Sequence, residues 1–260
     1  MSETVPADLV AFAGTLADAA RAVILPYFRS GLAVEDKADT SPVTIADREA
    51  EAAMRKLIEA RYPDHGINGE EHGVVRADAE YVWVLDPIDG TKSFLIGQPS
   101  FVTLIGLARR GRPVLGVVDQ PITRERWIGG AGHPTTHNGK PTRTAPCAGL
   151  AQAKLNATSH EMFRGANGEA FARVRSRIKQ VTFGGDGYAV ALIALGSLDL
   201  VIEARLQYFD YCALVPVIEA AGGVATDWQG QPLGPDSDGR ICMAGDARVH
   251  REALQALAGK

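Results

Sequence analysis

The sequence is poor in the features that mark several large classes of protein. It has only three cysteines in 260 residues, far apart in the chain, at Cys147, Cys212 and Cys242. Such a set fits buried thiols in a reducing compartment better than a disulfide framework or a zinc site. Basic residues are not in excess either, because 27 Lys and Arg stand against 31 Asp and Glu, a formal net charge of -4. This balance argues against nucleic acid as a partner.

Long apolar runs and targeting signals are also lacking. No apolar run approaches the roughly 20 residues that cross a bilayer. The N-terminus carries Glu3 and Asp8 and has no basic region of the kind that begins a signal peptide. We therefore expect no membrane partner and a cytoplasmic location. What is present, 46% hydrophobic and 22% charged residues, is typical of a globular protein with a substantial core.

The spacing of apolar residues changes along the first half of the chain. Helical spacing runs over residues 6–28 and again from Thr44 to about Tyr62. Thr44 and Asp47 have the spacing of a capping box, so this second helix is expected to begin there. An antiparallel meander should follow, with strands at residues 81–85, 101–108, 114–119 and 126–129.

From about Ala153 onward, strands and helices are predicted to alternate. The strands are expected at residues 154–158, 181–183, 198–203, 224–227 and 241–244. The helices are expected at residues 168–178, 187–195, 211–221 and 247–258. The pattern predicts an α+β half over residues 1–150 and an α/β half over residues 151–260, without repeats or a low-complexity linker.

Two aspartates follow the predicted strand at 81–85, in the stretch WVLDPIDGTKSF. Asp86 and Asp89 could simply form a turn, because Asp-Pro and Asp-Gly are common turn pairs. However, Gly90 lets the backbone approach a ligand closely, and a short helical turn starting near Thr91 would offer free amides to an anion. Carboxylates beside an anion site repel a phosphate unless cations lie between them. This stretch therefore favours hard divalent cations that bridge protein and phosphate oxygens.

More acids lie upstream of this stretch. Glu70 and Glu71, in NGEEHG, are expected on a loop before the strand that ends at Asp86. Every candidate ligand is an oxygen donor, which suits Mg²⁺ or Mn²⁺ and argues against zinc. Asp47 is a more ambiguous candidate, because the capping box explains it at least as well as a functional role.

The motif DPIDGT resembles the signature of the inositol monophosphatase-like family of Mg²⁺-dependent, lithium-sensitive phosphatases. The resemblance extends from ADTSPVTIADREAE through GEE to YFDYCALVPVIEAAGG, nearly the whole chain. DKADTSPVTIADREAE, WVLDPIDGTKSF, FGGDGYA and TDWQG are most similar to the histidinol-phosphatase branch. The resemblance implies a layered αβαβα sandwich of the inositol monophosphatase/fructose bisphosphatase type, usually a homodimer, that acts on a small-molecule phosphate ester.

The resemblance also implies a role for each acid. Glu70, Asp86 and the Ile88 carbonyl would ligate a first Mg²⁺. Asp86, Asp89 and Asp210 would ligate a second, and Glu70 would hold a weaker third with waters near Asp47; Mn²⁺ is the alternative metal. Thr91, hydrogen-bonded to Asp47, would orient the attacking water, and Glu70 would be catalytic with them. The substrate would be contacted by Gly90, Thr91, Asp186, Glu203 and Asp210.

Each acid of the second half also has a simpler explanation. Asp210 could be the N-cap of a helix beginning at Tyr211, and Asp186 could cap a helix beginning at Gly187. Glu203 could be an exposed strand end. The polar loop around Lys37, Asp39 and Thr40 could be a mobile lid or a plain surface loop.

The substrate implied by the histidinol-phosphatase branch is L-histidinol phosphate, which carries an ammonium group and a titratable imidazole. Asp186 and Glu203 would favour such a cation over a neutral polyol. Inositol phosphate and adenosine bisphosphate remain alternatives within the family. A metal-binding scaffold without turnover is the alternative from another class, although a dead relative should have lost at least one of the acids or Thr91.

Overall fold

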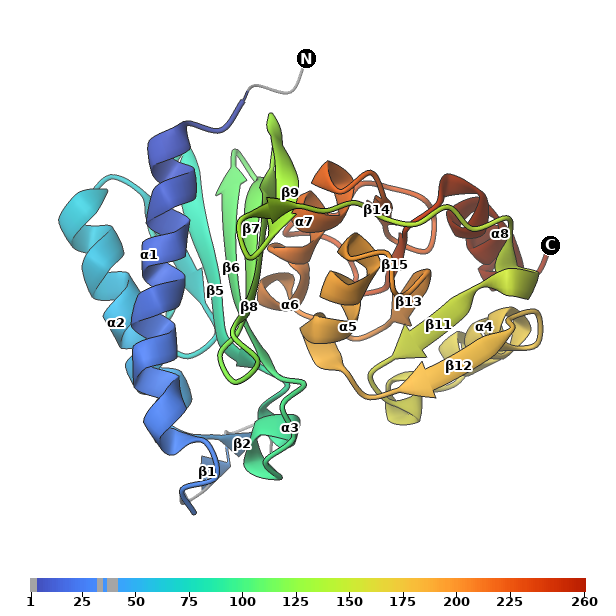
Figure 1. The fold of residues 1–260 in the computed structure, drawn as a ribbon, viewed down its shortest axis with the longest axis horizontal. Helices are drawn as coiled ribbons and strands as arrows, with labels where there is room; N and C mark the ends of the chain where they lie inside the picture. The colour runs from blue at the N-terminus through green and yellow to red at the C-terminus, as the bar shows by residue number, and fades with distance from the viewer. Residues whose placement is uncertain (1–3, 32–34, 37–41) are drawn as a thin grey trace.

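The computed structural model describes residues 4–31, 35–36 and 42–260 (Figure 1). The predicted lid around Lys37, Asp39 and Thr40 lies outside the described residues. The described residues form two large sheets, with helices outside and between them, and one small two-stranded sheet. The N-terminal helices and the eight-stranded sheet lie on one side of the molecule, and the five-stranded sheet lies on the other.

The first sheet is covered on its outer face by two long helices, α1 (Ala7–Ile24) and α2 (Ile45–Arg61). Its strand order is β10-β9-β8-β7-β6-β5-β3-β4, and the β3–β5 pair is parallel while the others are antiparallel. The strands are β3 (Gly66–Gly69), β4 (Gly73–Val75), β5 (Tyr81–Asp89), β6 (Val102–Arg109), β7 (Arg112–Gln120), β8 (Glu125–Gly130), β9 (His133–His137) and β10 (Lys140–Pro141). Three further short elements are the turn of 3-10 helix η1 (Leu25–Tyr27) and the paired strands β1 (Glu35–Asp36) and β2 (Pro42–Val43). Helix α3 (Thr91–Leu95) follows β5 directly.

The second sheet has the order β12-β11-β13-β15-β14. Strand β11 is parallel to β12 and β13, and the β13–β15 and β14–β15 pairs are antiparallel. The strands are β11 (Lys154–Ala157), β12 (Gln180–Phe183), β13 (Leu200–Glu203), β14 (Val224–Thr226) and β15 (Ile241–Ala244). The helices are η2 (Leu150–Gln152), η3 (His160–Met162), α4 (Ala166–Arg175), α5 (Asp186–Ala194), α6 (Tyr208–Tyr211), α7 (Leu214–Ala220) and α8 (Ala247–Leu257).

Among the described residues, three large apolar cores and a small fourth one join these elements into alternating layers. One core lies between α1, α2 and the first sheet, and another joins α5 and α7 to both sheets. The third lies between the second sheet and helices α4 and α8. Helix, sheet, helix, sheet and helix therefore follow one another across the molecule, which confirms the layered αβαβα sandwich (Figure 1).

Most predicted elements are present, and the differences have local causes. The meander of β5 to β8 is confirmed, but β3, β4, β9 and β10 were missed because they are short and rich in glycine or polar residues. The predicted helix at 211–221 is divided into α6 and α7. Pro216 has no amide to donate to the carbonyl of Cys212 four residues earlier, so a continuous helix cannot form there.

The break between α6 and α7 rests directly on the first sheet. Gly106 on β6 pairs with Gly116 on β7. A Cβ atom on Gly106 would lie 2.7 Å from Cys212 Sγ, and one on Gly116 would lie 1.8 Å from the Ala213 carbonyl oxygen. The two glycines therefore form a depression that accepts the residues directly after α6.

Helix α1 corrects the expectation that no apolar segment is long enough to cross a bilayer. The segment Ala7–Tyr27 is long and apolar enough to cross a membrane, judged by length and composition alone. A core helix can pass the same test, and α1 buries Leu9, Ala13 and Leu16 in the core under the first sheet. Its Arg21 donates to the buried carboxylate of Asp119 on β7, with Nη2 2.5 Å from Oδ1.

The cysteines agree with the expectation of unpaired thiols. All three are free, and Cys212 and Cys242 are buried while Cys147 is half-buried. Burial raises the pKa of the Cys212 and Cys242 thiols to about 12, so both carry their protons at neutral pH.

Candidate active site and metal centre

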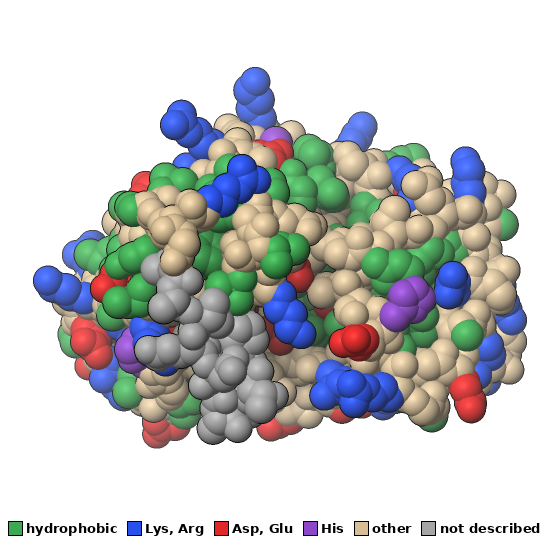
Figure 2. Space-filling view, turned by 90° about the horizontal axis from the view of Figure 1, so that it is seen from below, with side chains coloured by type: hydrophobic (Ala, Val, Ile, Leu, Met, Phe, Trp, Pro, Cys, Tyr) green, Lys and Arg blue, Asp and Glu red, His purple; other side chains and the backbone are tan. Residues whose placement is uncertain are grey.

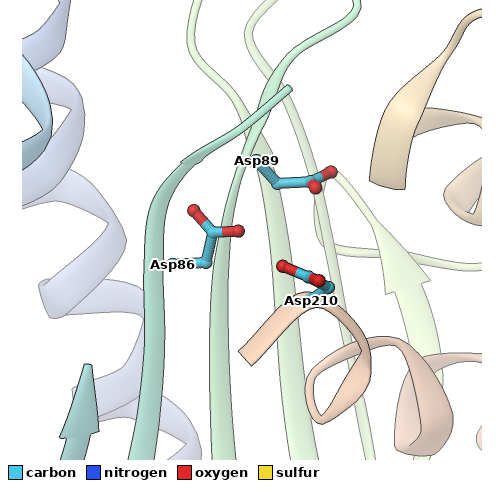
Figure 3. Close-up of side chains that lie close together, drawn as sticks. All are labelled: Asp86, Asp89 and Asp210. Carbon is cyan, nitrogen blue, oxygen red and sulfur yellow. The ribbon is translucent and has the colours of Figure 1, made fainter. Parts of the chain in front are cut away.

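Three aspartates converge between β5 and α6. Asp86 and Asp89 lie on β5, Asp210 lies on α6, and each offers a carboxylate oxygen within 4.8 Å of the others (Figure 3). In a regular strand, residues three apart point to opposite faces. The pairing of β5 with β6 shifts between Asp86 and Asp89, and this irregularity lets both side chains approach Asp210.

The carboxylates of this cluster are close enough to repel one another. Burial raises the pKa of Asp86 well above its usual range, and the charges of Glu70, Asp89 and Asp210 raise it further. Burial and the charges of Asp186 and Asp210 likewise raise the pKa of Asp89. Because every donor is a carboxylate oxygen, the set fits a hard divalent cation, which would relieve the repulsion.

Glu70 is placed beside Asp86 by the parallel pairing of β3 and β5. Gly69 lies opposite Leu85, and the next amide, that of Glu70, donates to the Leu85 carbonyl at 3.1 Å. Glu70 thus lies on the turn between β3 and β4, and its carboxylate raises the pKa of Asp86 by charge and by a hydrogen bond. The structure therefore brings together Glu70, Asp86, Asp89 and Asp210, the four predicted carboxylate ligands.

Asp47 forms the predicted capping box through one carboxylate oxygen and buries the other. Its Oδ2 accepts hydrogen bonds from the Thr44 amide at 2.9 Å and the Thr44 hydroxyl at 2.5 Å. Its Oδ1 is buried and accepts no hydrogen bond from the residues that the structure describes. Burial raises the pKa of Asp47 to about 6 against the effect of Thr44, and the charges of Glu71 and Glu70 add to the rise.

The expected hydrogen bond between Thr91 and Asp47 is not formed. The Thr91 hydroxyl donates instead to the Ile88 carbonyl at 3.2 Å, the same carbonyl that was predicted to ligate a metal. Thr91 is the first residue of α3, so the carbonyl three residues earlier is within reach of its side chain. The Ile88 amide donates to Asp86 Oδ1 at 3.1 Å, which ties this backbone to the cluster.

The predicted short helical turn is confirmed as α3, and Gly90 begins it. Gly90 has a φ of +87°, in the left-handed region that favours glycine. A Cβ atom at Gly90 would lie 2.5 Å from Asp186 Oδ2, so a side chain is excluded for a second reason. The amides of the first turn of α3 are not used inside the helix and remain available to a ligand.

Of the acids of the second half, Asp186 and Glu203 do not fit their simpler explanations, whereas Asp210 does take part in capping a helix. Asp186 is the first residue of α5 and does not cap it; its Oδ2 accepts from the hydroxyls of Ser93 at 2.7 Å and Ser100 at 3.4 Å. Glu203 ends β13 but is only 6% exposed. Asp210 is the third residue of α6 and not the N-cap of a helix beginning at Tyr211, but it still caps α6: its carboxylate accepts from the Gln207 amide at 2.7 Å as one half of a capping box.

Glu203 is buried, and burial disfavours the charged form of its carboxylate. Its Oε1 accepts from both the amide and the hydroxyl of Thr158, at 3.1 and 2.6 Å. Burial raises the pKa of Glu203 to about 7, and the charges of Asp186 and Asp210 add to the rise. Seen from below, acidic side chains are partly visible in the hollow between the two sides of the molecule, and Lys and Arg side chains are dispersed around it (Figure 2).

Two residues of this region were missed by sequence reasoning. The Gly187 amide donates to Asp89 Oδ2 at 2.5 Å, and a Cβ at Gly187 would lie 2.7 Å from the same oxygen. Glu51 on α2 is fully buried although its side chain is a carboxylic acid. A signal for Glu51 was available, because it lies four residues after Asp47 and so on the same face of the helix.

Comparison with known proteins agrees with this geometry. The sequence profile of the inositol monophosphatase family matches residues 6–259. The chain belongs to the inositol monophosphatase family. The names of its relatives are those of phosphatases, so this member of the family is a phosphoric monoester hydrolase. Family members are generally metal-dependent, in line with the acidic cluster.

Relatives with different named activities lie within the family. The chain is 46% identical to the bifunctional phosphatase IMPL2, chloroplastic, of Arabidopsis thaliana, over 99% of this chain and 77% of that protein. It is 32% identical to the histidinol-phosphatase of Chlorobaculum parvum, over 87% of this chain and 88% of that protein. The structure of an inositol monophosphatase from Zymomonas mobilis matches with a TM-score of 0.91 and 44% identity, over 98% of this chain and 100% of that one.

Proposed function

We propose that the enzyme hydrolyses L-histidinol phosphate to L-histidinol and phosphate with Mg²⁺, a step of histidine biosynthesis. The observation that carries the proposal is the pair of acids, Asp186 and Glu203, beside the carboxylate cluster. Both are close enough to the cluster to raise the pKa of Asp89. A substrate whose leaving group carries an ammonium and an imidazole would offset these charges, whereas a neutral polyol would not. The relatives named histidinol-phosphatase support the same choice.

The chain offers oxygen ligands for two or three Mg²⁺ ions, with Mn²⁺ as the alternative. Glu70, Asp86 and the Ile88 carbonyl are proposed for the first, and Asp86, Asp89 and Asp210 for the second. A weaker third would use Glu70 with waters near Asp47. When bound, such cations neutralise the phosphate charge and activate water.

The residues around the cluster then have proposed roles in binding and orientation. Asp47, Glu70 and Thr91 would orient the attacking water, for which the buried Oδ1 of Asp47 offers an acceptor. The amides of Gly90 and Thr91 would hold phosphate oxygens. Thr91 would act through its hydrogen bonds and not as a nucleophile, so the water attacks phosphorus in line and no phosphoenzyme forms. Asp210 would also contact the leaving group, together with Asp186 and Glu203.

Inositol 1-phosphate is the second candidate substrate. It is favoured by the similarity to inositol monophosphatases, among them one from Zymomonas mobilis. We propose further that the enzyme is a cytoplasmic homodimer, on the basis of its composition and of the assembly usual in the family.

Substrate choice can be tested by phosphate release in Mg²⁺ from L-histidinol phosphate, inositol 1-phosphate and 3′-phosphoadenosine 5′-phosphate, measured side by side. We expect kcat/KM for L-histidinol phosphate to exceed the others by at least about 100-fold, about 2.7 kcal/mol of transition-state preference. Equal or reversed values would overturn the assignment to histidine biosynthesis and leave the phosphatase. If the protein binds metal but releases phosphate from none of the esters, the result would favour a metal-binding scaffold without turnover.

A further inference from the structure

The turn that carries Glu70 is held by a buried carboxylate from a different element. Glu51 on α2 is 0% exposed. Its Oε2 accepts a hydrogen bond from the Glu71 amide at 2.8 Å, and its Oε1 accepts one from the His72 amide at 3.1 Å. Two successive amides that point at one carboxylate form an anion-binding concavity in the backbone. Glu51 thus fixes the two residues that directly follow Glu70.

Arg55 completes the contact from the next turn of α2. Its Nε donates to Glu51 Oε1 at 2.7 Å, and its side chain is only 11% exposed. Its Nη2 donates to the Gly73 carbonyl, at the start of β4. The backbone from residue 71 to residue 73 is therefore bound through both its amides and a carbonyl, which restricts the orientation of the turn more than either contact alone.

The strand before the turn leaves room for this pair of side chains. Gly69 is the last residue of β3 and directly precedes Glu70. A Cβ atom at Gly69 would lie 2.0 Å from Glu51 Oε1 and 2.7 Å from Arg55 Nη2. Glu51 and Arg55 thus pack against the backbone on both sides of Glu70, and the helix and the turn are in direct contact at this point.

We propose that Glu51 is a positioning residue for metal binding: with Arg55 it fixes the turn that presents the Glu70 carboxylate to Asp86. The inference rests on the proposed role of Glu70 as a metal ligand. Asp47, Glu51 and Arg55 are four residues apart, so they share one face of α2. One face of this helix therefore supports the metal centre twice, through Asp47 and through the turn. Groups that orient metal ligands commonly change metal affinity by about 10–100-fold when they are replaced.

The test is metal binding by the intact, metal-free protein, followed through the free Mn²⁺ signal in electron paramagnetic resonance. Glu51→Gln keeps the shape of the side chain but has one acceptor oxygen, so one of the two amides faces an NH₂ group. We expect Mn²⁺ to bind about 10–100-fold more weakly. The control is Glu49→Gln, which removes a carboxylate from the same helix. Among the described residues, this carboxylate accepts a hydrogen bond from the Tyr27 hydroxyl only. This control should bind Mn²⁺ like the parent.

Two further readouts separate positioning from a general loss of stability. In the variant, the amide signals of Glu71 and His72 should move in NMR spectra and exchange faster with solvent. If Glu51→Gln is an active phosphatase, turnover at saturating metal should recover toward the parent value while the metal concentration for half-activation rises. A folded Glu51→Gln protein that binds Mn²⁺ as the parent does would overturn the proposal.

Arg55→Lys keeps the test decisive if Glu51→Gln does not fold. Lysine retains the charge but lacks the planar fork whose two nitrogens contact Glu51 and the Gly73 carbonyl separately. We expect weaker Mn²⁺ binding than in Glu49→Gln, and parent-like binding in a folded Arg55→Lys protein would overturn the proposal. Because the measurement needs no substrate, a parent that binds Mn²⁺ but hydrolyses no ester would contradict the proposed function while leaving this inference standing.

Discussion

Replacing Glu203 by glutamine should stabilise the metal-free protein while damaging the enzyme. Glutamine is nearly the same shape, and its single amide oxygen can accept both hydrogen bonds that Thr158 now donates to Oε1. The substitution therefore removes a buried negative charge and keeps its contacts. It separates the effect of the charge from the effect of packing.

The size of the stability change follows from the pKa of Glu203, which burial and neighbouring acids raise from 4.5 to about 7. Because the folded protein holds this proton more tightly than the unfolded chain, its free energy of unfolding falls as the pH rises from about 4.5 to about 7. At about 1.4 kcal/mol per pH unit, the loss reaches about 3 kcal/mol and is constant above pH 7. Glu203→Gln does not titrate, so it should be up to about 3 kcal/mol more stable than the parent at pH 8. Near pH 4 the two proteins should be equally stable.

The assay is urea unfolding of both proteins in EDTA at pH 8 and near pH 4. Glu161→Gln is the control, because Glu161 is an exposed acid on η3 and its replacement should change little. In Glu203→Gln, kcat/KM for L-histidinol phosphate should fall about 10–100-fold, since a hydrogen bond to a charged group contributes about 1.5–3 kcal/mol. A folded Glu203→Gln protein that is no more stable than the parent at pH 8 would refute the reasoning about the buried charge.

Three other perturbations probe the metal centre and its surroundings. Asp89→Asn should remove most phosphate release at saturating Mg²⁺ and leave a folded protein by circular dichroism; a parent-like rate would show that Asp89 is not a metal ligand. Gly90→Ala should lower the free energy of unfolding by about 1–3 kcal/mol, because it combines positive φ with a contact to Asp186. Gly139→Ala is its control in the same urea titration, since Gly139 has a φ of +76° and no atom within 4 Å of an added Cβ; equal losses would show that the contact is harmless. EDTA should abolish phosphate release and added Mg²⁺ should restore it, and the thermal midpoint should rise with Mg²⁺ concentration; activity that survives chelation would rule out metal-dependent chemistry.

The sequence predicted those parts of the site that depend on local order. Asp86, Asp89 and Gly90 follow one another in a single motif, so an acidic strand end before a helical turn could be inferred from the residues alone. The approach of Asp210 could not, because it depends on how α6 packs on β5, more than a hundred residues away in sequence. Its role was inferred only from the resemblance to a family.

Interactions between side chains and distant backbone were the least predictable. The capping box of Asp47 with Thr44 is local and was predicted correctly. The Thr91 hydroxyl binds the nearby Ile88 carbonyl and not Asp47, because hydroxyl contacts depend on small differences in position that a sequence does not encode. Glu51 was missed for a similar reason, since its partners are backbone amides about one helix and one strand further along the chain.

Because of the depression formed by Gly106 and Gly116, the geometry of the active site depends on residues in the middle of the first sheet. The residues directly after α6 rest on these two glycines, so the depth of that contact determines how closely Asp210 approaches Asp86 and Asp89. A side chain at either position would push α6 away from the first sheet. Both glycines therefore help to place the proposed metal ligands, although neither has a side chain that could touch a metal or a substrate.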